Sequence, residues 1–281
     1  MTDAGDKRSR FRRMHESGCF VIPNPWDVGS ARYLEGMGFK ALASTSSGSA
    51  WSAGAPDNGI SLETALAHLR ALAAATDLPL NADFESGFAR DAEGVARNVA
   101  RCIETGVAGL SIEDSTGDPD RPLYEPSEAV ERLRAARAAI DAQGGEVLLV
   151  GRAECFLTGH PDPLPEAIRR LRAYAEAGAD VLYAPGTRTR EEIAAVVAAV
   201  APKPVNVLAM APMNLTVADL AALGVRRISV GGALARTAWG GFIRAAREIA
   251  ANGSFTALAE GAPSSELNGF FSQARAARDR G

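Results

Sequence analysis

The sequence predicts a (β/α)8 barrel, and three observations lead to that prediction. First, four segments share one pattern, in which a helix ends, a glycine follows, and a short apolar run begins two or three residues later. Second, a glycine there suits the left-handed position that closes a helix, and the apolar run suits a strand buried on both faces. These glycines are Gly38, Gly106, Gly178 and Gly224. Third, further apolar runs bring the total to eight, separated by Ala- and Arg-rich helical stretches, within about 250 residues.

The expected strands lie at 19–22, 41–44, 79–83, 109–113, 147–152, 180–184, 204–208 and 226–230. An open doubly wound sheet is the alternative, but no GxGxxG opens a helix after the first strand. No linker or low-complexity stretch divides the chain, so we expect residues 1–281 to form one barrel domain. We expect an additional C-terminal helix at about 263–280, whose Phe270 and Phe271 could dock on the barrel or on a neighbouring subunit.

Composition narrows the classes of function. A net charge of −4 and a pI near 5.6 give no broad electrostatic footprint for nucleic acid. A basic cluster near the start is brief, so we interpret residues 1–15 as a solvated arm; it holds Lys7, Arg8, Arg10, Arg12 and Arg13. No apolar run approaches the ~20 residues of a membrane span and no secretion signal is recognisable, so we expect a cytoplasmic protein that binds no membrane. Three widely separated cysteines without CxxC spacing argue against disulfides and zinc.

Polar residues that directly follow the apolar runs are the candidate site, because barrel active sites lie at the C-terminal ends of the strands. They are Thr45, Ser46, Ser47 and Asp57 after the second strand, Asp83 and Glu85 after the third, Glu113 after the fourth, Arg152 after the fifth and Asn206 after the seventh.

Four of these candidates are acids, namely Asp57, Asp83, Glu85 and Glu113. So many carboxylates could not all ionise in one cleft without a counter-charge. Oxygen ligands with no nearby Cys or His suit Mg²⁺, or Mn²⁺, rather than zinc, and Mg²⁺ keeps several waters. The alternative is that these acids are helix N-caps and solvated loop charges.

Four motifs, in their order along the chain, indicate a protein family. They are "GFKALASTSSGSAWSAGAPD", "LNADFESGF", "GLSIEDS" and "LLVGRAECF". Together they make the chain resemble the isocitrate lyase and phosphoenolpyruvate mutase superfamily, from about Phe11 to the C-terminal helix. The resemblance implies a (β/α)8 TIM barrel that forms a homo-oligomer, a dimer or tetramer, with the C-terminal helix exchanged between neighbouring barrels.

The resemblance also implies Mg²⁺ and a small 2-oxo or 2-hydroxy carboxylate, with cleavage or rearrangement of a C–C or C–P bond. Asp83 matches the direct metal ligand, whereas Asp57 and Glu113 match acids that hold metal-bound waters. The loop of Thr45, Ser46 and Ser47 matches the one that receives a carboxylate or oxyanion, and Arg152 matches the arginine that grips a carboxylate or phosphoryl group. Asn81 departs from the family pattern, since many members have an Asp there.

Cleaving a C–C bond next to a carbonyl leaves an enolate, which a chelated cation stabilises, while a guanidinium binds a carboxylate bidentately. We therefore expect Arg152, Glu113 and Thr45 to be catalytic and Asn206 to contact substrate. The alternative is a structural role, in which Arg152 only forms an ion pair with Glu154.

The loop after the fourth strand limits what the family implies. It reads "STGDPDRPLYEPSEAVERL" and contains no Cys, His or Lys, the residues that serve family lyases and mutases there. We expect Tyr124 to pack this lid, and His15 and His68 to be structural. The sequence thus predicts a Mg²⁺-dependent lyase or decarboxylase acting on an oxaloacetate-like or methylisocitrate-like acid. The alternatives are an enzyme working at a C–P bond and a barrel that binds a 2-oxo acid without turnover.

Overall fold

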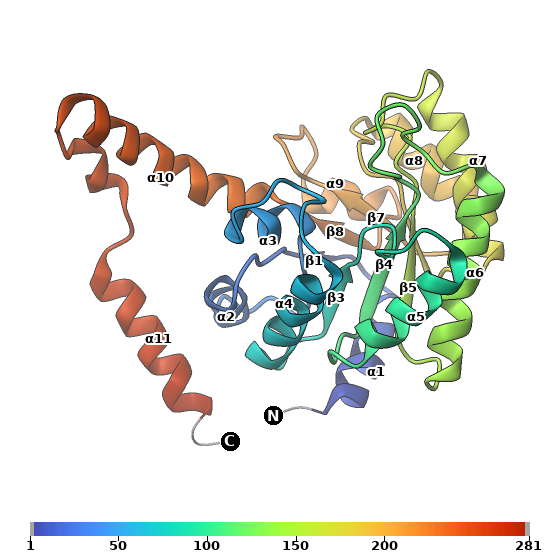
Figure 1. Ribbon diagram of the computed structural model, residues 1–281, viewed down its shortest axis with the longest axis horizontal. Coiled ribbons are helices and arrows are strands. Elements are labelled where there is room, and N and C mark those ends of the chain that lie inside the picture. Colours follow the sequence, from blue (N-terminus) through green and yellow to red (C-terminus); the bar gives the residue numbers. More distant parts are fainter. Residues whose placement is uncertain (1–2, 279–281) are drawn as a thin grey trace.

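The computed structural model describes residues 3–278 and confirms the barrel (Figure 1). Eight parallel strands form one sheet in the order β1-β8-β7-β6-β5-β4-β3-β2. They are β1 Phe20–Ile22, β2 Leu42–Ala43, β3 Leu80–Asp83, β4 Gly109–Glu113, β5 Leu148–Arg152, β6 Val181–Tyr183, β7 Val205–Leu208 and β8 Arg227–Ser229. The ring is nearly closed between β1 and β2, where the Ala43 amide donates to the Pro23 carbonyl at 3.1 Å.

Each predicted apolar run contains one of these strands. The helices around them are α1 Ala4–Met14, α2 Val28–Gly36, α3 Ser46–Ser52, α4 Leu62–Ala75, α5 Ala92–Ile103, α6 Pro126–Ala142, α7 Pro163–Glu176, α8 Arg190–Val200, α9 Val217–Ala222, α10 Ala233–Asn252, the 3-10 helix η1 Thr256–Glu260 and α11 Ser264–Arg278. Three of the repeat glycines sit at φ +91° to +100° and Gly224 at +87°, as a left-handed helix end requires.

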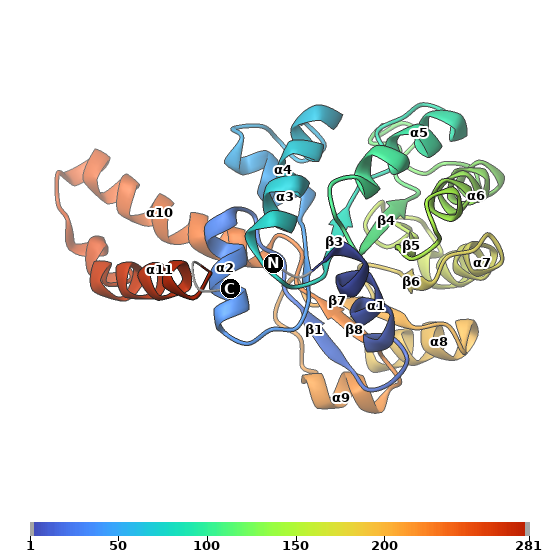
Figure 2. The same cartoon turned by 90° about the horizontal axis from the view of Figure 1, so that it is seen from below.

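The N-terminal segment is not a solvated arm, and that prediction is wrong. Residues 4–14 form α1, which lies across the N-terminal end of the barrel (Figure 2). Phe11 is fully buried, and the Lys7 ammonium donates to the carbonyl oxygens of Ala73 at 3.0 Å and Thr76 at 2.6 Å. Arg8 likewise donates to the Ile103 carbonyl at the end of α5. Carbonyls at a helix end accept such donors because they have no partner within their own helix.

Aromatic rings close the bottom of the barrel above α1. The His15 ring lies edge-on to Phe11, with ring centroids 4.7 Å apart, and to Phe20 at 5.1 Å. His15 Nδ1 hydrogen-bonds to the Phe11 carbonyl at 2.8 Å. His15 is therefore structural, as expected.

The C-terminal part leaves the barrel and returns (Figure 1). Helix α10 extends away from the sheet, and α11 runs back to pack on α2. The ring centroids of Phe270 and Tyr33 lie 4.5 Å apart, and Tyr33 Oη donates to Glu266 Oε1 at 2.9 Å. The extra helix is thus confirmed and docks on its own barrel, while its exchange between subunits stays a prediction.

A search of residues 3–278 finds no helix with the length and apolar character needed to span a membrane.

Candidate active site

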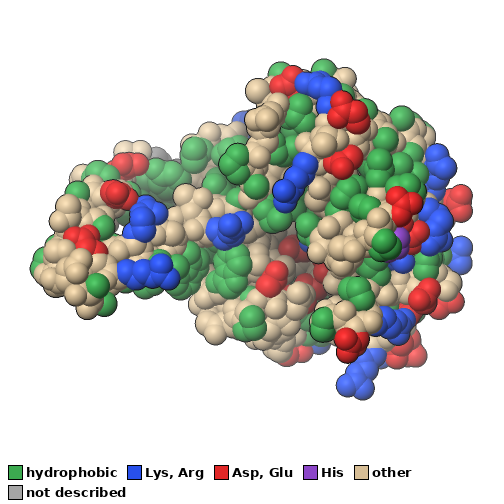
Figure 3. All heavy atoms as spheres, turned by 90° about the horizontal axis from the view of Figure 1, so that it is seen from above, with side chains coloured by type: hydrophobic (Ala, Val, Ile, Leu, Met, Phe, Trp, Pro, Cys, Tyr) green, Lys and Arg blue, Asp and Glu red, His purple; other side chains and the backbone are tan. Residues whose placement is uncertain are grey.

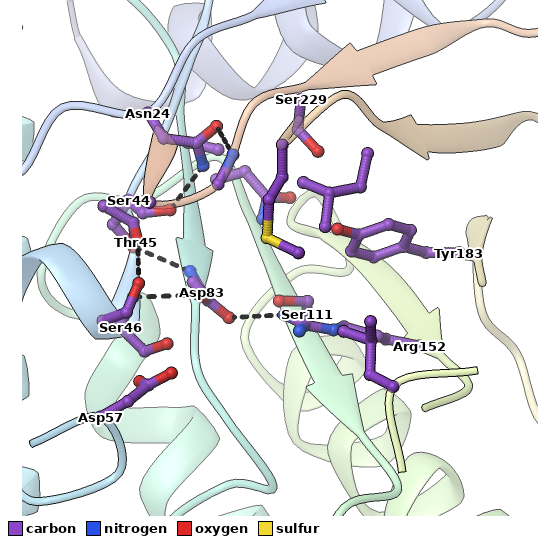
Figure 4. A pocket seen from close by; sticks show the side chains of 18 of the residues that line it. Asn24, Ser44, Thr45, Ser46, Asp57, Asp83, Ser111, Arg152, Tyr183 and Ser229 are labelled. Carbon is purple, nitrogen blue, oxygen red and sulfur yellow. Dashed lines mark hydrogen bonds and ion pairs between the residues drawn. The ribbon is translucent and has the colours of Figure 1, made fainter. Parts of the chain in front are cut away.

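A cavity of about 240 Å³ opens at the C-terminal ends of the strands, on the face seen in Figure 3 and from close by in Figure 4. It contains six of the predicted site residues, Thr45, Ser46, Ser47, Asp57, Asp83 and Arg152. Glu85, Glu113 and Asn206 are not among the described residues that line it. Pockets for drug-sized ligands measure roughly 300–1,000 Å³, so a cavity of this size suits a carboxylic acid of a few carbons.

The loop after β2 faces Asp83. Thr45 caps α3, since its Oγ1 accepts from the Gly48 amide at 3.3 Å and lies 3.1 Å from Ser47 Oγ. The Ser46 amide then donates to Asp83 Oδ2 at 3.0 Å. The start of this helix therefore already presents a backbone donor to an anion.

Asp83 is the last residue of β3, as the motif "LNADFESGF" predicts. Its own amide donates to Ser44 Oγ at 2.8 Å, which fixes the strand end against the loop after β2. The other carboxylate oxygen, Oδ1, accepts from Arg152 Nη1 at 3.2 Å, and these contacts are visible in Figure 4. Asp83 is 16% exposed, so it is partly shielded yet reachable from the cavity.

Arg152 lies among three acids. Its Nη1 is 3.2 Å from both Asp83 Oδ1 and Glu113 Oε2, and its Nε bonds to Glu154. Its guanidinium carbon also sits 5.2 Å from the centre of the Tyr183 ring. Arg152 therefore does pair with Glu154, and it still lines the cavity. The structural interpretation and the substrate-binding interpretation of Arg152 are compatible.

The acids outnumber this one guanidinium. Burial raises the pKa of Glu113, and Arg152 only partly offsets that effect. Burial, and then the charges of Asp83 and Asp57, raise the pKa of Glu85 to about 8. Glu85 Oε1 is buried without a hydrogen-bond partner among residues 3–278. The pKa of Asp57 is raised too, first by desolvation and then by Asp83.

This excess of negative charge suits a divalent cation. Within residues 3–278, however, no three His, Cys, Asp or Glu side chains are grouped so that they could hold one. The four-acid metal site therefore stays a prediction.

Asn206 lies at the floor of the barrel rather than in the cavity wall. It is 1% exposed, its Nδ2 donates to Ser229 Oγ at 2.9 Å, and its Oδ1 accepts from Arg227 Nε at 2.7 Å. Arg227 lines the cavity and also donates to Asn81 Oδ1 at 3.3 Å. Sequence reasoning missed Arg227, because it examined only residues at the C-terminal ends of the strands.

Two other residues that organise the site were not predicted to do so. Asn24 Oδ1 accepts from the amides of Val230 at 2.9 Å and Gly231 at 2.8 Å, and its Nδ2 donates to the Ser44 carbonyl at 2.8 Å. Asn24 thereby joins the ends of β1, β2 and β8. Asp114 turns away from the cavity, and its Oδ1 accepts from the Glu154 amide at 2.8 Å.

Arg132 and Arg170 contact Tyr124 in the lid after β4. The Tyr124 ring lies 4.1 Å from the Arg132 guanidinium, and its carbonyl accepts from Arg170 Nη1 at 2.9 Å. Arg132 donates in turn to the Ser86 carbonyl at 2.7 Å, in the loop that carries Glu85. Tyr124 packs the lid, as expected, and is not among the cavity-lining residues described.

Comparison with known proteins shows the family of this chain. The family described as phosphoenolpyruvate phosphomutase matches residues 11–250. The chain belongs to this family. The match runs from the middle of α1 almost to the end of α10, so it includes the whole barrel and every predicted site residue.

Relatives of this phosphoenolpyruvate phosphomutase family member are lyases and mutases by description. A Burkholderia cenocepacia J2315 protein, described in general terms as a lyase/mutase, is 46% identical with a TM-score of 0.90, covering 95% of this chain and 96% of its own. The oxaloacetate decarboxylase of Rhodopseudomonas palustris (strain BisB5) is 32% identical over 265 residues, 91% of this chain and 86% of its own. A structure of oxaloacetate acetylhydrolase with oxalate is 27% identical with a TM-score of 0.83, covering 95% and 94%.

Proposed function

We propose that this protein is a Mg²⁺-dependent carbon–carbon lyase or decarboxylase acting on a small 2-oxo or 2-hydroxy carboxylic acid. The observation that carries the proposal is the contact of Asp83 with both the Ser46 amide and Arg152 at the mouth of a small polar cavity. An acid, a guanidinium and a backbone donor meet there, as binding a metal and a carboxylate together requires.

The residues present fit a divalent cation. Glu85 has a buried oxygen without a hydrogen-bond partner among residues 3–278, and Asp83 is a partly exposed acid in the cavity wall. Asp83 would hold Mg²⁺, or Mn²⁺, directly, and Asp57, Glu85 and Glu113 would act through bound waters, because Mg²⁺ retains several. When bound, the cation supplies Lewis-acid stabilisation of the enolate that forms as the C–C bond breaks.

The other residues position the acid and control its protons. Ser46 and Ser47 present the start of α3 to a carboxylate, and Arg152 offers a planar guanidinium that can bind a second oxygen pair. Burial raises the pKa of the cavity-lining Tyr183 to about 12, so its hydroxyl stays protonated and donates near neutrality. Decarboxylation suits this site because it needs a metal, a carboxylate grip and a later proton, but no lid base.

A C–P bond enzyme is the second candidate, and the family's description favours it. The surroundings of Arg152 argue against it, because Asp83, Glu113 and Glu154 all contact that guanidinium and would repel a dianionic phosphoryl group. Turnover of phosphonopyruvate would reverse this ranking, whether it is hydrolysed to pyruvate and phosphate or rearranged to phosphoenolpyruvate, which is measured separately.

The test is a pyruvate-release assay with and without Mg²⁺ across oxaloacetate, substituted malates, 2-methylisocitrate and phosphonopyruvate. We expect one carboxylic acid to turn over at a rate that falls at least 100-fold with EDTA or in Asp83→Asn. Asp91→Asn is the matched control, since Asp91 caps α5 and asparagine caps equally well. Binding of a 2-oxo acid with no turnover of any substrate would instead support the non-catalytic barrel.

We also propose that the chain forms a homo-oligomer, with its cytoplasmic location remaining an expectation. Helix α10 exposes large apolar side chains, including Trp239, Phe242 and Ile243, which a partner subunit would cover. Light scattering after size-exclusion chromatography should give a dimer or tetramer mass. A monomer mass at 50 μM would contradict this, and Phe242→Glu should shift an oligomer toward monomer.

A further inference from the structure

Arg227 is a buried cation without an acidic partner. It is 3% exposed, and its two hydrogen bonds go to neutral amide oxygens, Asn206 Oδ1 at 2.7 Å and Asn81 Oδ1 at 3.3 Å. Its pKa is lowered by burial to about 10, which still leaves it charged near neutrality. Within residues 3–278 no carboxylate forms an ion pair with it, whereas buried Arg170 has Asp114 at 3.0 Å.

Such an arrangement is costly in a folded protein. A buried charge is normally paired, because removing it from water costs several kcal/mol and neutral acceptors offset only part of this. Arginine has five N–H donors, and residues 3–278 accept hydrogen bonds from two of those on Arg227. Three donors therefore remain for a group that enters from outside the chain.

Arg227 belongs to the wall of the substrate cavity, together with Asn81 and Ser229. The pairing of neighbouring strands runs without a break from Arg152 through Tyr183 and Asn206 to Arg227. Arg152 is the last residue of β5, whereas Arg227 is the first of β8.

Because the strands of a barrel are tilted, residues paired along this row lie at different heights along the barrel axis. Three steps of about 4.8 Å between strands tilted by about 36° place the Arg227 Cα roughly 8 Å below that of Arg152. A ligand in the cavity therefore has Arg152 and the Ser46 loop at the mouth and Arg227 at the floor.

We propose that Arg227 binds a second anionic group of the substrate, so that the site selects dicarboxylates over monocarboxylates. This deepens the proposed function and rests on it for the identity of the site. Asn81 contributes by remaining neutral, because an aspartate there would pair with Arg227 and occupy the charge that the ligand needs. The departure from the family pattern at residue 81 thereby acquires a role in specificity.

The test measures binding of two four-carbon acids that differ only by a carboxylate at C4, malate and 2-hydroxybutanoate. Calorimetry with Mg²⁺ present compares the wild-type protein with Arg227→Met, which removes the charge, and Asn81→Asp, which neutralises it internally. The control is Arg226→Met, because Arg226 bonds the Gly18 carbonyl away from the cavity. Thermal unfolding verifies that each variant is folded.

We expect the wild-type protein and Arg226→Met to bind malate at least tenfold more tightly than 2-hydroxybutanoate. In both Arg227→Met and Asn81→Asp this ratio should fall below threefold, with 2-hydroxybutanoate affinity changed less than threefold. Retention of the preference by either variant in folded form would overturn the proposal, as would a wild-type protein that binds neither acid or prefers neither. If Arg227→Met does not fold, Asn81→Asp decides, because it keeps the guanidinium in place.

The outcomes separate this inference from the proposed function. An Arg227-dependent preference for malate without metal-dependent cleavage of any substrate would refute the proposed reaction and leave the inference standing. Metal-dependent cleavage that proceeds equally well in folded Arg227→Met would support the reaction and refute the inference.

Discussion

Arg152 Nη1 lies 3.2 Å from Asp83 Oδ1, in an ion pair whose two side chains are each 16% exposed. The pair joins the end of β5 to the end of β3 across β4. It connects the residue we expect to hold the metal with the residue we expect to grip the substrate. A change in either side chain should therefore affect both tasks.

Arg152→Lys should lower kcat/KM roughly 100-fold on the substrate that the assay identifies. Lysine keeps the positive charge but loses the planar fork that can contact Asp83, Glu113 and a ligand together. Steady-state kinetics measures the effect, with Arg97→Lys as control because Arg97 forms an exposed pair on α5. Activity of Arg152→Lys within threefold of wild type would show that charge alone suffices.

His15→Phe should flatten the acid side of the stability profile. Burial, and then the charge of Arg227, lower the folded-state pKa of His15 from 6.5 to about 3. Between these two pKa values the unfolded chain binds a proton at His15 and the folded chain does not. The free energy of unfolding therefore falls as pH drops from about 6.5 toward 3. At pH 5 the loss is about 2 kcal/mol. Urea unfolding at pH 7 and pH 5 should show this extra loss in wild type only, and equal losses in both proteins would contradict the assignment.

Lys7→Met should lower the free energy of unfolding by about 2 kcal/mol. The substitution keeps the apolar stem but removes the ammonium from the Ala73 and Thr76 carbonyls at the end of α4. Chemical unfolding measures it against Arg13→Met, an exposed neighbour on the same helix, which should change stability by less than ~0.5 kcal/mol. Equal effects of the two variants would restore the interpretation of a solvated arm.

Gly36→Ala should release α11 from α2. A Cβ at residue 36 would lie 2.3 Å from the Phe270 ring, too close for the ring to stay in place. Hydrogen exchange of α11 amides should therefore become faster. Gly269→Ala is the matched control, because Gly269 has no neighbour of its Cβ position within 4 Å among residues 3–278, and exchange there should not become faster. Unchanged exchange in Gly36→Ala would show that Phe270 does not pack there in solution.

The strands were predictable because each lies buried between the barrel interior and a helix. Such strands contain runs of apolar residues, such as Leu148, Leu149 and Val150 in β5, and the glycine before several of them marks the end of a helix. Since parallel strands present their C-terminal ends on one side, the meeting of Asp83 with Arg152 also followed from the strand positions.

The function of the N-terminal basic residues was not predictable in the same way. Lys7 binds carbonyls of residues 73 and 76, and no local pattern near residue 7 indicates which distant helix ends there. Cationic clusters are usually solvated, and this one is not because the bottom of the barrel offers unpaired helix carbonyls.

The chain sequence thus determines where the strands begin and end and which residues reach the rim of the barrel. Tertiary structure decides which way neighbouring side chains face. Glu113 contacts Arg152 in the site, while the adjacent Asp114 contacts Arg170 behind it. Arg227 lines the cavity without a carboxylate partner among residues 3–278. Neighbouring side chains along a strand face opposite sides of the sheet. In strands of two to five residues, only the closure and tilt of the barrel select which side is the interior.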